Sequence, residues 1–239
     1  IDKLNQFIEK NGKNKIDYIY LVTCPYCLNG QPFSFANIKD ANRIAKANNI
    51  PLVIDISNIF ENSYWIKKSE KEKKEGDLKN IAKDIVELGD IIIMDGSQNA
   101  RSDVGSFIAS KNDDFFEKFM NQVVVFEGLH TYGGMTGRAM EVFAIGISEL
   151  ENEDYINWYQ SQINTLYQML KDKNIPVLLG AKGISLDVEK FLPHIPFDNY
   201  PKFVLASALY IQGGIRGRID GDWLFHSELD GKYVLTLEL

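Results

Sequence analysis

The chain has 239 residues, of which 45% are hydrophobic and 25% charged, and its formal net charge is −7. This composition is typical of a globular protein with one large domain or two modest ones. The negative charge argues against a nucleic-acid partner, whose phosphates would be repelled. No apolar run approaches the roughly 20 residues of a membrane helix, and two cysteines are too few for a secreted disulfide scaffold. We therefore expect a cytoplasmic protein without a membrane partner.

The first part of the chain alternates between strands and helices. Apolar runs bounded by turn residues predict strands at 18–23, 52–57, 90–96 and 104–110. Helical spacing of apolar residues predicts helices at 3–10, 35–48, 59–88, 112–122 and 135–173. The mixed-charge run at 67–76 is typical of a solvated helix face.

The pattern changes after Pro176. Short apolar strands follow, with one helix at 201–212 and a last strand, YVLTLEL, at 233–239. Alternating strands and helices followed by a smaller mixed segment predict a three-layer α/β domain and a second α+β domain. We place these domains at 1–160 and 161–239.

Both cysteines lie in one short motif, CPYC at 24–27. Cys24 and Cys27 have the spacing of a thiol–disulfide site. Such sites lie at a helix N-terminus, whose partial positive charge lowers the thiol pKa, but here a turn follows and Pro32 delays the next helix to about residue 34. We therefore favour two structural thiols and keep the redox site as an alternative. Two cysteines cannot fill a zinc site, and the three histidines lack ligand spacing, so no metal is expected.

Several longer motifs carry a family resemblance. They are VTC (22–24), GQPFSFANIK (30–39), LVIDIS (52–57), ENSYWIK (61–67), EGLHTYGGMTGRAMEVFAIGI (127–147) and FLPHIP (191–196). Together they resemble the tryptophanase and tyrosine phenol-lyase family, the pyridoxal-phosphate-dependent β-eliminating lyases. The resemblance runs from residue 1 to 239 but covers only part of a family chain. It implies the large domain of the aspartate aminotransferase fold (fold type I), truncated at its N-terminal side, and a reduced small α+β domain at the C-terminus.

The resemblance also implies where the family's chemistry would lie. The Schiff-base lysine of the family corresponds to Gln98, and the lysine beside it to Ser97. An amide nitrogen is not nucleophilic, so Gln98 cannot form an imine. A serine that approaches the cofactor phosphate corresponds to Asp95. Two unit charges about 4 Å apart repel by roughly 4 kcal/mol at an effective dielectric near 20, so this carboxylate would weaken phosphate binding.

The remaining positions are mixed. Asp55 matches the aspartate that pairs with the pyridinium nitrogen, although it could simply cap a strand end, and Asn58 stands where the family has an arginine. Tyr132 matches a loop near the cofactor. Val234 stands at the arginine that clamps the substrate carboxylate, so this clamp is lost. The resemblance thus implies a residual cleft lined by Asp55, Asn58, Asp95, Ser97, Gln98 and Tyr132.

These substitutions predict a catalytically silent relative of the lyases that acts as a structural or regulatory subunit, with no covalently bound pyridoxal phosphate. One alternative is a split lyase whose lysine and phosphate loop come from a partner chain. The other is a thiol–disulfide module that uses the CPYC motif. A half-length chain should expose surface that a partner covers. We therefore expect a homo-oligomer, or a partner chain that supplies the missing N-terminal half.

Overall fold

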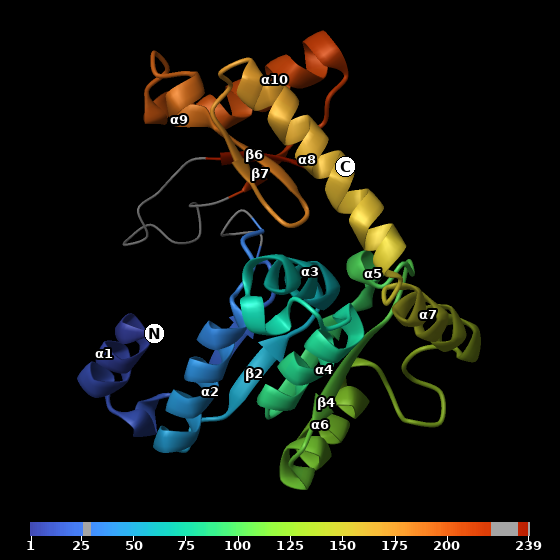
Figure 1. Ribbon diagram of the computed structural model, residues 1–239. Helices are drawn as coiled ribbons and strands as arrows, with labels where there is room; N and C mark the ends of the chain where they lie inside the picture. Colours follow the sequence, from blue (N-terminus) through green and yellow to red (C-terminus); the bar gives the residue numbers. More distant parts are fainter. Residues whose placement is uncertain (26–29, 221–233, 239) are drawn as a thin grey trace. The chain divides into compact units, whose positions relative to one another are not determined.

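The computed structural model describes residues 1–25, 30–220 and 234–238 (Figure 1). They form two compact units, the first made of Ile1–Thr23 and Phe33–Glu153, the second of Cys24–Pro32 and Asp154–Leu239. The domain boundary expected after residue 160 lies within helix α8 (Glu153–Asp172), whereas the units divide at the start of that helix.

The first unit is built on a sheet of four described strands. These are β1 (Ile19–Val22), β2 (Leu52–Asp55), β3 (Ile91–Asp95) and β4 (Ser106–Ser110), in the order β1-β2-β3-β4. The first three are parallel and β4 pairs antiparallel to β3. Runs of β-branched residues in β2 and β3 favour the extended conformation. All four strands that the apolar runs predict are present, each slightly shorter than expected.

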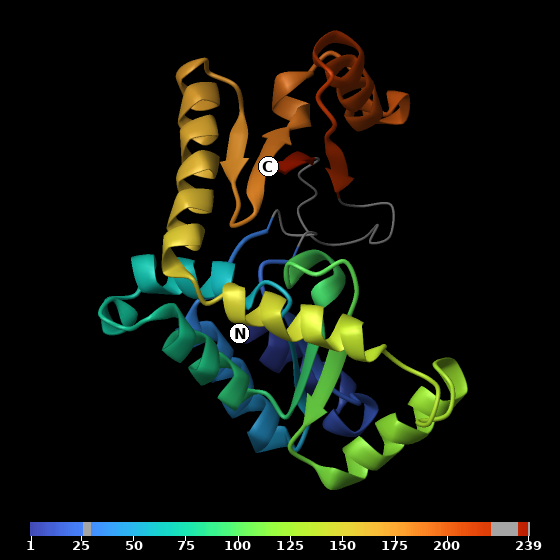
Figure 2. The same ribbon diagram turned by 90° about the vertical axis from the view of Figure 1, so that its right-hand side faces the viewer.

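Helices precede, connect and follow these strands along the chain. They are α1 (Asp2–Asn11), α2 (Phe35–Asn48), α3 (Ile59–Ser69), α4 (Leu78–Leu88), the short α5 (Gly96–Asn99), α6 (Asp113–Phe126) and α7 (Gly137–Glu149). The starts of α2 and α4 follow the capping rules, because Ser34 accepts a hydrogen bond from the Asn37 N–H and Asp77 from the Asn80 N–H. Figure 2 shows α6 and α7 at the β4 end of the sheet.

Two of the expected helices are wrong in their extent. The helix expected over 59–88 is two helices, because Glu70 is extended and Asp77 caps the new helix α4. The Glu153 carboxylate also accepts a hydrogen bond from the Leu78 N–H (2.9 Å) at this start. The helix expected over 135–173 is α7 followed by α8. The break falls at Leu150, which turns into the core and is 5% exposed.

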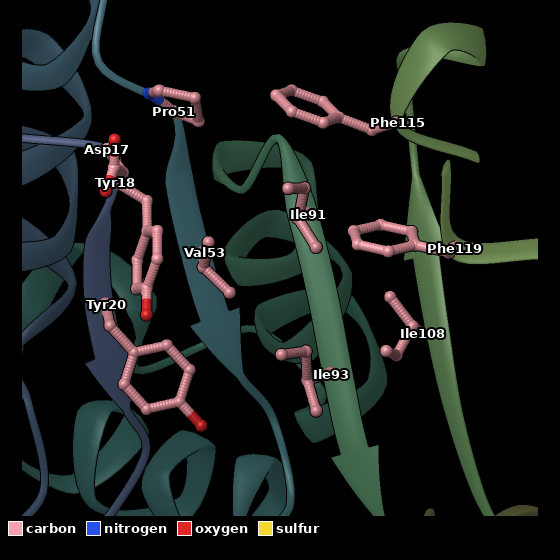
Figure 3. A pocket seen from close by; sticks show the side chains of 10 residues that line it. All are labelled: Asp17, Tyr18, Tyr20, Pro51, Val53, Ile91, Ile93, Ile108, Phe115 and Phe119. Atoms are coloured by element: carbon pink, nitrogen blue, oxygen red, sulfur yellow. The ribbon is translucent and has the colours of Figure 1, made fainter. Parts of the chain in front are cut away.

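One face of the first sheet is covered by helices. Leu52, Ile54 and Ile92 point to this face and are 0%, 1% and 6% exposed. A side chain at Gly89, where α4 ends, would lie 2.5 Å from the Ile92 side chain and 3.2 Å from that of Ile54. The helices behind the strands in Figure 3 therefore form a tightly packed layer on this side.

The second unit is a smaller antiparallel α+β structure. Its described strands are β5 (Val177–Leu179), β6 (Gly183–Asp187), β7 (Arg218–Asp220) and β8 (Val234–Glu238), in the order β5-β6-β8-β7. Figure 2 shows α8 running beside β5 and β6, where Gln160 and Tyr159 donate hydrogen bonds to the turn between these strands. Helices α9 (Val188–Phe191) and α10 (Pro201–Gly213) complete the unit around a core of Leu186, Val188 and Leu205. In the described part of the chain, no helix combines the length and apolar character needed to cross a membrane.

Candidate functional site

The carboxyl ends of the parallel strands bring two acidic side chains to one edge of the first sheet. Asp55 is the last residue of β2 and Asp95 the last residue of β3. In open α/β sheets this edge is where ligands bind. This edge of the sheet is therefore the candidate functional site.

The Asp55 carboxylate accepts three hydrogen bonds from its own chain. Its Oδ2 accepts from the Tyr20 hydroxyl on neighbouring strand β1 at 2.9 Å. Its Oδ1 accepts from the backbone N–H and the hydroxyl of Ser57, at 3.0 and 2.6 Å. Both carboxylate oxygens are thus engaged within the protein.

Tyr20 is held as a hydrogen-bond donor. Burial, followed by the hydrogen bond and the charge of Asp55, raises the pKa of Tyr20 to about 12. Each effect disfavours the phenolate, either by desolvation or by placing a second negative charge beside Asp55. Tyr20 therefore stays protonated across the physiological pH range and donates a hydrogen bond to Asp55.

Asp95 repeats the local arrangement of Asp55. Its Oδ1 accepts from the N–H and the hydroxyl of Ser97, at 2.9 and 2.7 Å, and so caps helix α5. The Ser57 hydroxyl connects the two aspartates, because it donates to Asp55 and accepts from the Asp95 N–H at 3.0 Å. Tyr20, Asp55, Ser57, Asp95 and Ser97 form one hydrogen-bonded group, which we call the Asp55–Asp95 group.

Asn58 lies behind this group. Its backbone N–H donates to the Thr23 hydroxyl and its side-chain amide to the Thr23 carbonyl, both at 3.2 Å. Asn58 is 2% exposed. It therefore ties the ends of β1 and β2 together and does not present its amide to an open cleft.

Comparison with known proteins identifies the family to which this chain belongs. A family model described as β-eliminating lyase matches residues 1–196. The chain belongs to the β-eliminating lyase family. It is 35% identical over 218 residues to the tyrosine phenol-lyase of Pasteurella multocida, covering 90% of this chain and 48% of the relative. It is 32% identical over 233 residues to the tryptophanase of Salinibacter ruber, covering 97% and 49%.

A solved structure shares the fold of this β-eliminating lyase family member. It is a protein from Exiguobacterium sp. 255-15 described as an aromatic amino acid β-eliminating lyase/threonine aldolase. Its TM-score is 0.54 at 15% identity, over 71% of this chain and 45% of that one. The expected family and its fold class are confirmed. The chain spans about half the length of the relatives that it matches.

Three candidate positions of this family member lie outside the Asp55–Asp95 group. Gln98 belongs to α5, where its backbone alone is described. Tyr132 lies in the loop before α7 and is 78% exposed. Val234 begins β8 of the second unit, where its backbone pairs with Asp187 and Asp220. Their proposed roles stay predictions.

The expected roles of the two cysteines stay predictions as well. Cys24 is fully buried and has a left-handed φ of 48°. Cys27 lies outside the described residues. Within the described ranges, no three His, Cys, Asp or Glu side chains gather so as to hold a metal ion.

Sequence reasoning missed Tyr20 and Ser57. Ser57 had a visible signal, because each aspartate ends an apolar run and stands two residues before a serine, in IDIS and MDGS. An aspartate in this position hydrogen-bonds the backbone two residues on, as an Asx-turn. Tyr20 had none, since its contact with Asp55 depends on the pairing of β1 with β2.

Proposed function

We propose that this family member is a catalytically silent relative of the β-eliminating lyases and acts as a structural or regulatory subunit of an oligomer. The observation that carries the proposal is the state of Asp55. By resemblance, this carboxylate would pair with the pyridinium nitrogen of pyridoxal phosphate. Here the Tyr20 phenol already donates to Oδ2, and Ser57 donates twice to Oδ1.

The Asp55–Asp95 group does not fit pyridoxal phosphate. A pyridinium nitrogen would have to displace a neutral phenol whose ring stands beside the carboxylate. At the phosphate position implied by resemblance, Asp95 takes the donors of Ser97 for its own carboxylate, so these are not offered to an incoming anion. Its negative charge would repel that anion.

The absence of a suitable amine supports the same conclusion. Gln98 stands where resemblance places the Schiff-base lysine. Its amide lone pair is delocalised, so it does not attack an aldehyde. Arg101 nearby donates to Glu149 (3.3 Å), and a guanidinium stays protonated at every pH at which proteins are folded. Neither residue supplies the nucleophile.

The proposal is tested by covalent trapping. The purified chain is incubated with pyridoxal phosphate, treated with borohydride and analysed by mass spectrometry of its peptides. We expect no reduced pyridoxyl adduct in the segment that contains Gln98 and no pyruvate from tyrosine, tryptophan or an S-alkyl cysteine. The tyrosine phenol-lyase of Pasteurella multocida is the positive control. A stoichiometric adduct at one lysine together with pyruvate release would overturn the proposal.

A further inference from the structure

Helix α10 of the second unit is apolar on two opposite sides (Figure 1). Its inner side carries Leu205, which packs with Leu186 and Val188 in the core of the unit. Its outer side carries large apolar side chains that are between 43% and 76% exposed. Together with the exposed Ser207 they form what we call the α10 stripe: Tyr200, Phe203, Val204, Ser207, Tyr210 and Ile211. A helix that is apolar all round is normally buried, so the stripe indicates an interaction surface.

The stripe is symmetric about Ser207. Residues three or four positions apart lie on the same side of a helix, and the stripe keeps this spacing along α10. Two large apolar side chains stand three and four residues on either side of Ser207: Phe203 with Val204 before it, and Tyr210 with Ile211 after it. If a second α10 lay antiparallel on the first, with a two-fold axis at Ser207, Phe203 of each copy would meet Ile211 of the other. The stripe is therefore complementary to itself.

No charged side chain interrupts the stripe. Lys202 is the single charged residue in the sequence of α10. It is 8% exposed and lies on the inner side of the helix, three residues before Leu205. Two copies of a chain with a net charge of −7 repel each other on average. At the α10 stripe, however, two copies can meet without placing equal charges against each other.

Residues of opposite charge flank the two ends of the stripe. Asp198 precedes α10 and Arg216 follows it, each nine residues from Ser207, and both are exposed. An antiparallel pair of helices would bring the Asp198 end of each copy to the Arg216 end of the other. A parallel pair would instead bring like charges together. Complementary charges at the rim of an interface fix its register and orientation, so these two residues favour the antiparallel pair.

We infer that the α10 stripe is the contact surface for a second copy of this chain, in an antiparallel two-fold pair of α10 helices. A two-fold interface brings the same surface patch together from both copies, and the symmetry about Ser207 meets this requirement. The small Ser207 side chain at the crossing point allows the two helix axes to approach to the usual distance of about 8–10 Å. One pair of helices is a small interface, so the dimer should form reversibly. The inference rests on the oligomer in the proposed function and not on catalytic silence.

The first test measures the oligomeric state of the chain. Analytical ultracentrifugation over a range of concentrations should show a monomer in equilibrium with a dimer. Ile211→Lys should raise the Kd of the dimer about tenfold or more, because the dimer would bury an unpaired charge from each copy. Val125→Lys is the matched control, since Val125 is a 72% exposed residue of α6 in the first unit, and its variant should dimerise like the unchanged chain. Circular dichroism checks that all variants fold alike.

The second test exchanges the charges at the ends of the stripe. Asp198→Arg and Arg216→Asp should each weaken the dimer severalfold, because like charges would then lie at both ends of the helix pair. The double variant should recover the affinity of the unchanged chain, since opposite charges again lie against each other. A double variant that is as weak as the two single variants would contradict the antiparallel arrangement.

The third test detects the two-fold axis directly. Ser207→Cys should form a disulfide-linked dimer under mild oxidation, because each new thiol faces its own copy. Ala208→Cys is the control, since Ala208 is exposed but lies off the stripe, and the unchanged chain controls for the native cysteines. A monomer at every concentration, a dimer that persists in Ile211→Lys, or no more cross-linking in Ser207→Cys than in Ala208→Cys would each overturn the inference. None of these results changes the borohydride outcome, so the two proposals fail separately.

Discussion

Asp55 and Asp95 owe their arrangement to a local rule that repeats. Each ends a strand, and each carboxylate accepts from the N–H and the hydroxyl of a serine two residues later. Hydrogen bonds to a charged acceptor are stronger than neutral ones, so each turn is stable without help from a ligand. The hydrogen-bonding groups of the two turns are therefore paired within the protein, in contrast to a site whose polar groups are left open for a cofactor.

At this scale we predict the titration of Tyr20. The tyrosine ring signal that disappears in Tyr20→Phe should titrate near pH 12 in NMR spectra. Asp55→Asn should lower this pKa but leave it above the ordinary value, because burial is the largest cause of the shift and remains. A titration at about pH 10 in the unchanged chain, the value of a free tyrosine, would contradict the hydrogen bond.

The same shift fixes a pH dependence of stability. The pKa of Tyr20 is higher in the folded state than the value of 10.0 for an unperturbed tyrosine. The folded state is therefore favoured while the phenol is protonated, and this contribution is fully present below about pH 10 and is lost as the pH rises towards 12. Chemical denaturation across this window should show the loss in the unchanged chain and a smaller loss in Tyr20→Phe.

At the scale of the elements, α7 makes a close contact with the segment after α5. A Cβ added at Gly146 would lie 1.9 Å from the Ala100 carbonyl oxygen. Glycine thus lets α7 approach the backbone closely at this point. The contact also explains why the chain does not continue as one long helix, since α7 must stay on the first unit up to Leu150.

We predict that Gly146→Ala destabilises the protein. Helix α7 would have to move off the backbone at Ala100, and such overpacking typically costs about 1–3 kcal/mol. Gly137 in the same helix has no atom within 4 Å of its added Cβ, so Gly137→Ala should be neutral or stabilising by up to about 1 kcal/mol. Urea denaturation of both variants measures the difference. Equal stability of the two variants would refute the close contact.

At the scale of the whole molecule, local patterns predicted most elements of the fold. The strands of the first sheet follow from their apolar runs, and α2 follows from Ser34 and its helical spacing. The breaks at 70–77 and at Leu150 could not be predicted in this way, because they involve tertiary contacts. Glu153 accepts a hydrogen bond from the Leu78 N–H at the start of α4, and Leu150 is buried in the core. The aspartates of the site were visible in the sequence, but the Tyr20 contact was not, since it depends on the pairing of strands far apart in the chain.

Several substituted positions together, and not the missing lysine alone, are expected to prevent lyase activity. Gln98→Lys would restore an amine at the position where resemblance places the Schiff-base lysine. An amine alone does not make a lyase, because residues that act as a unit have strongly non-additive effects. Asp95 would still hold Ser97 and repel a phosphate, and Tyr20 would still occupy Asp55. We expect Gln98→Lys to release no pyruvate from tyrosine, tryptophan or an S-alkyl cysteine above the level of the unchanged chain.

A matched series separates the causes. Tyr20→Phe frees one oxygen of Asp55, and Asp95→Ser removes the charge that opposes the phosphate. Adding these changes to Gln98→Lys should raise the affinity for pyridoxal phosphate, measured by its absorbance during titration, with the largest step at Asp95→Ser because a full charge is removed. Tyr18→Phe is the control, since Tyr18 is exposed on the same strand edge and its change leaves Asp55 untouched. Pyruvate release by Gln98→Lys alone would show that the site lies elsewhere.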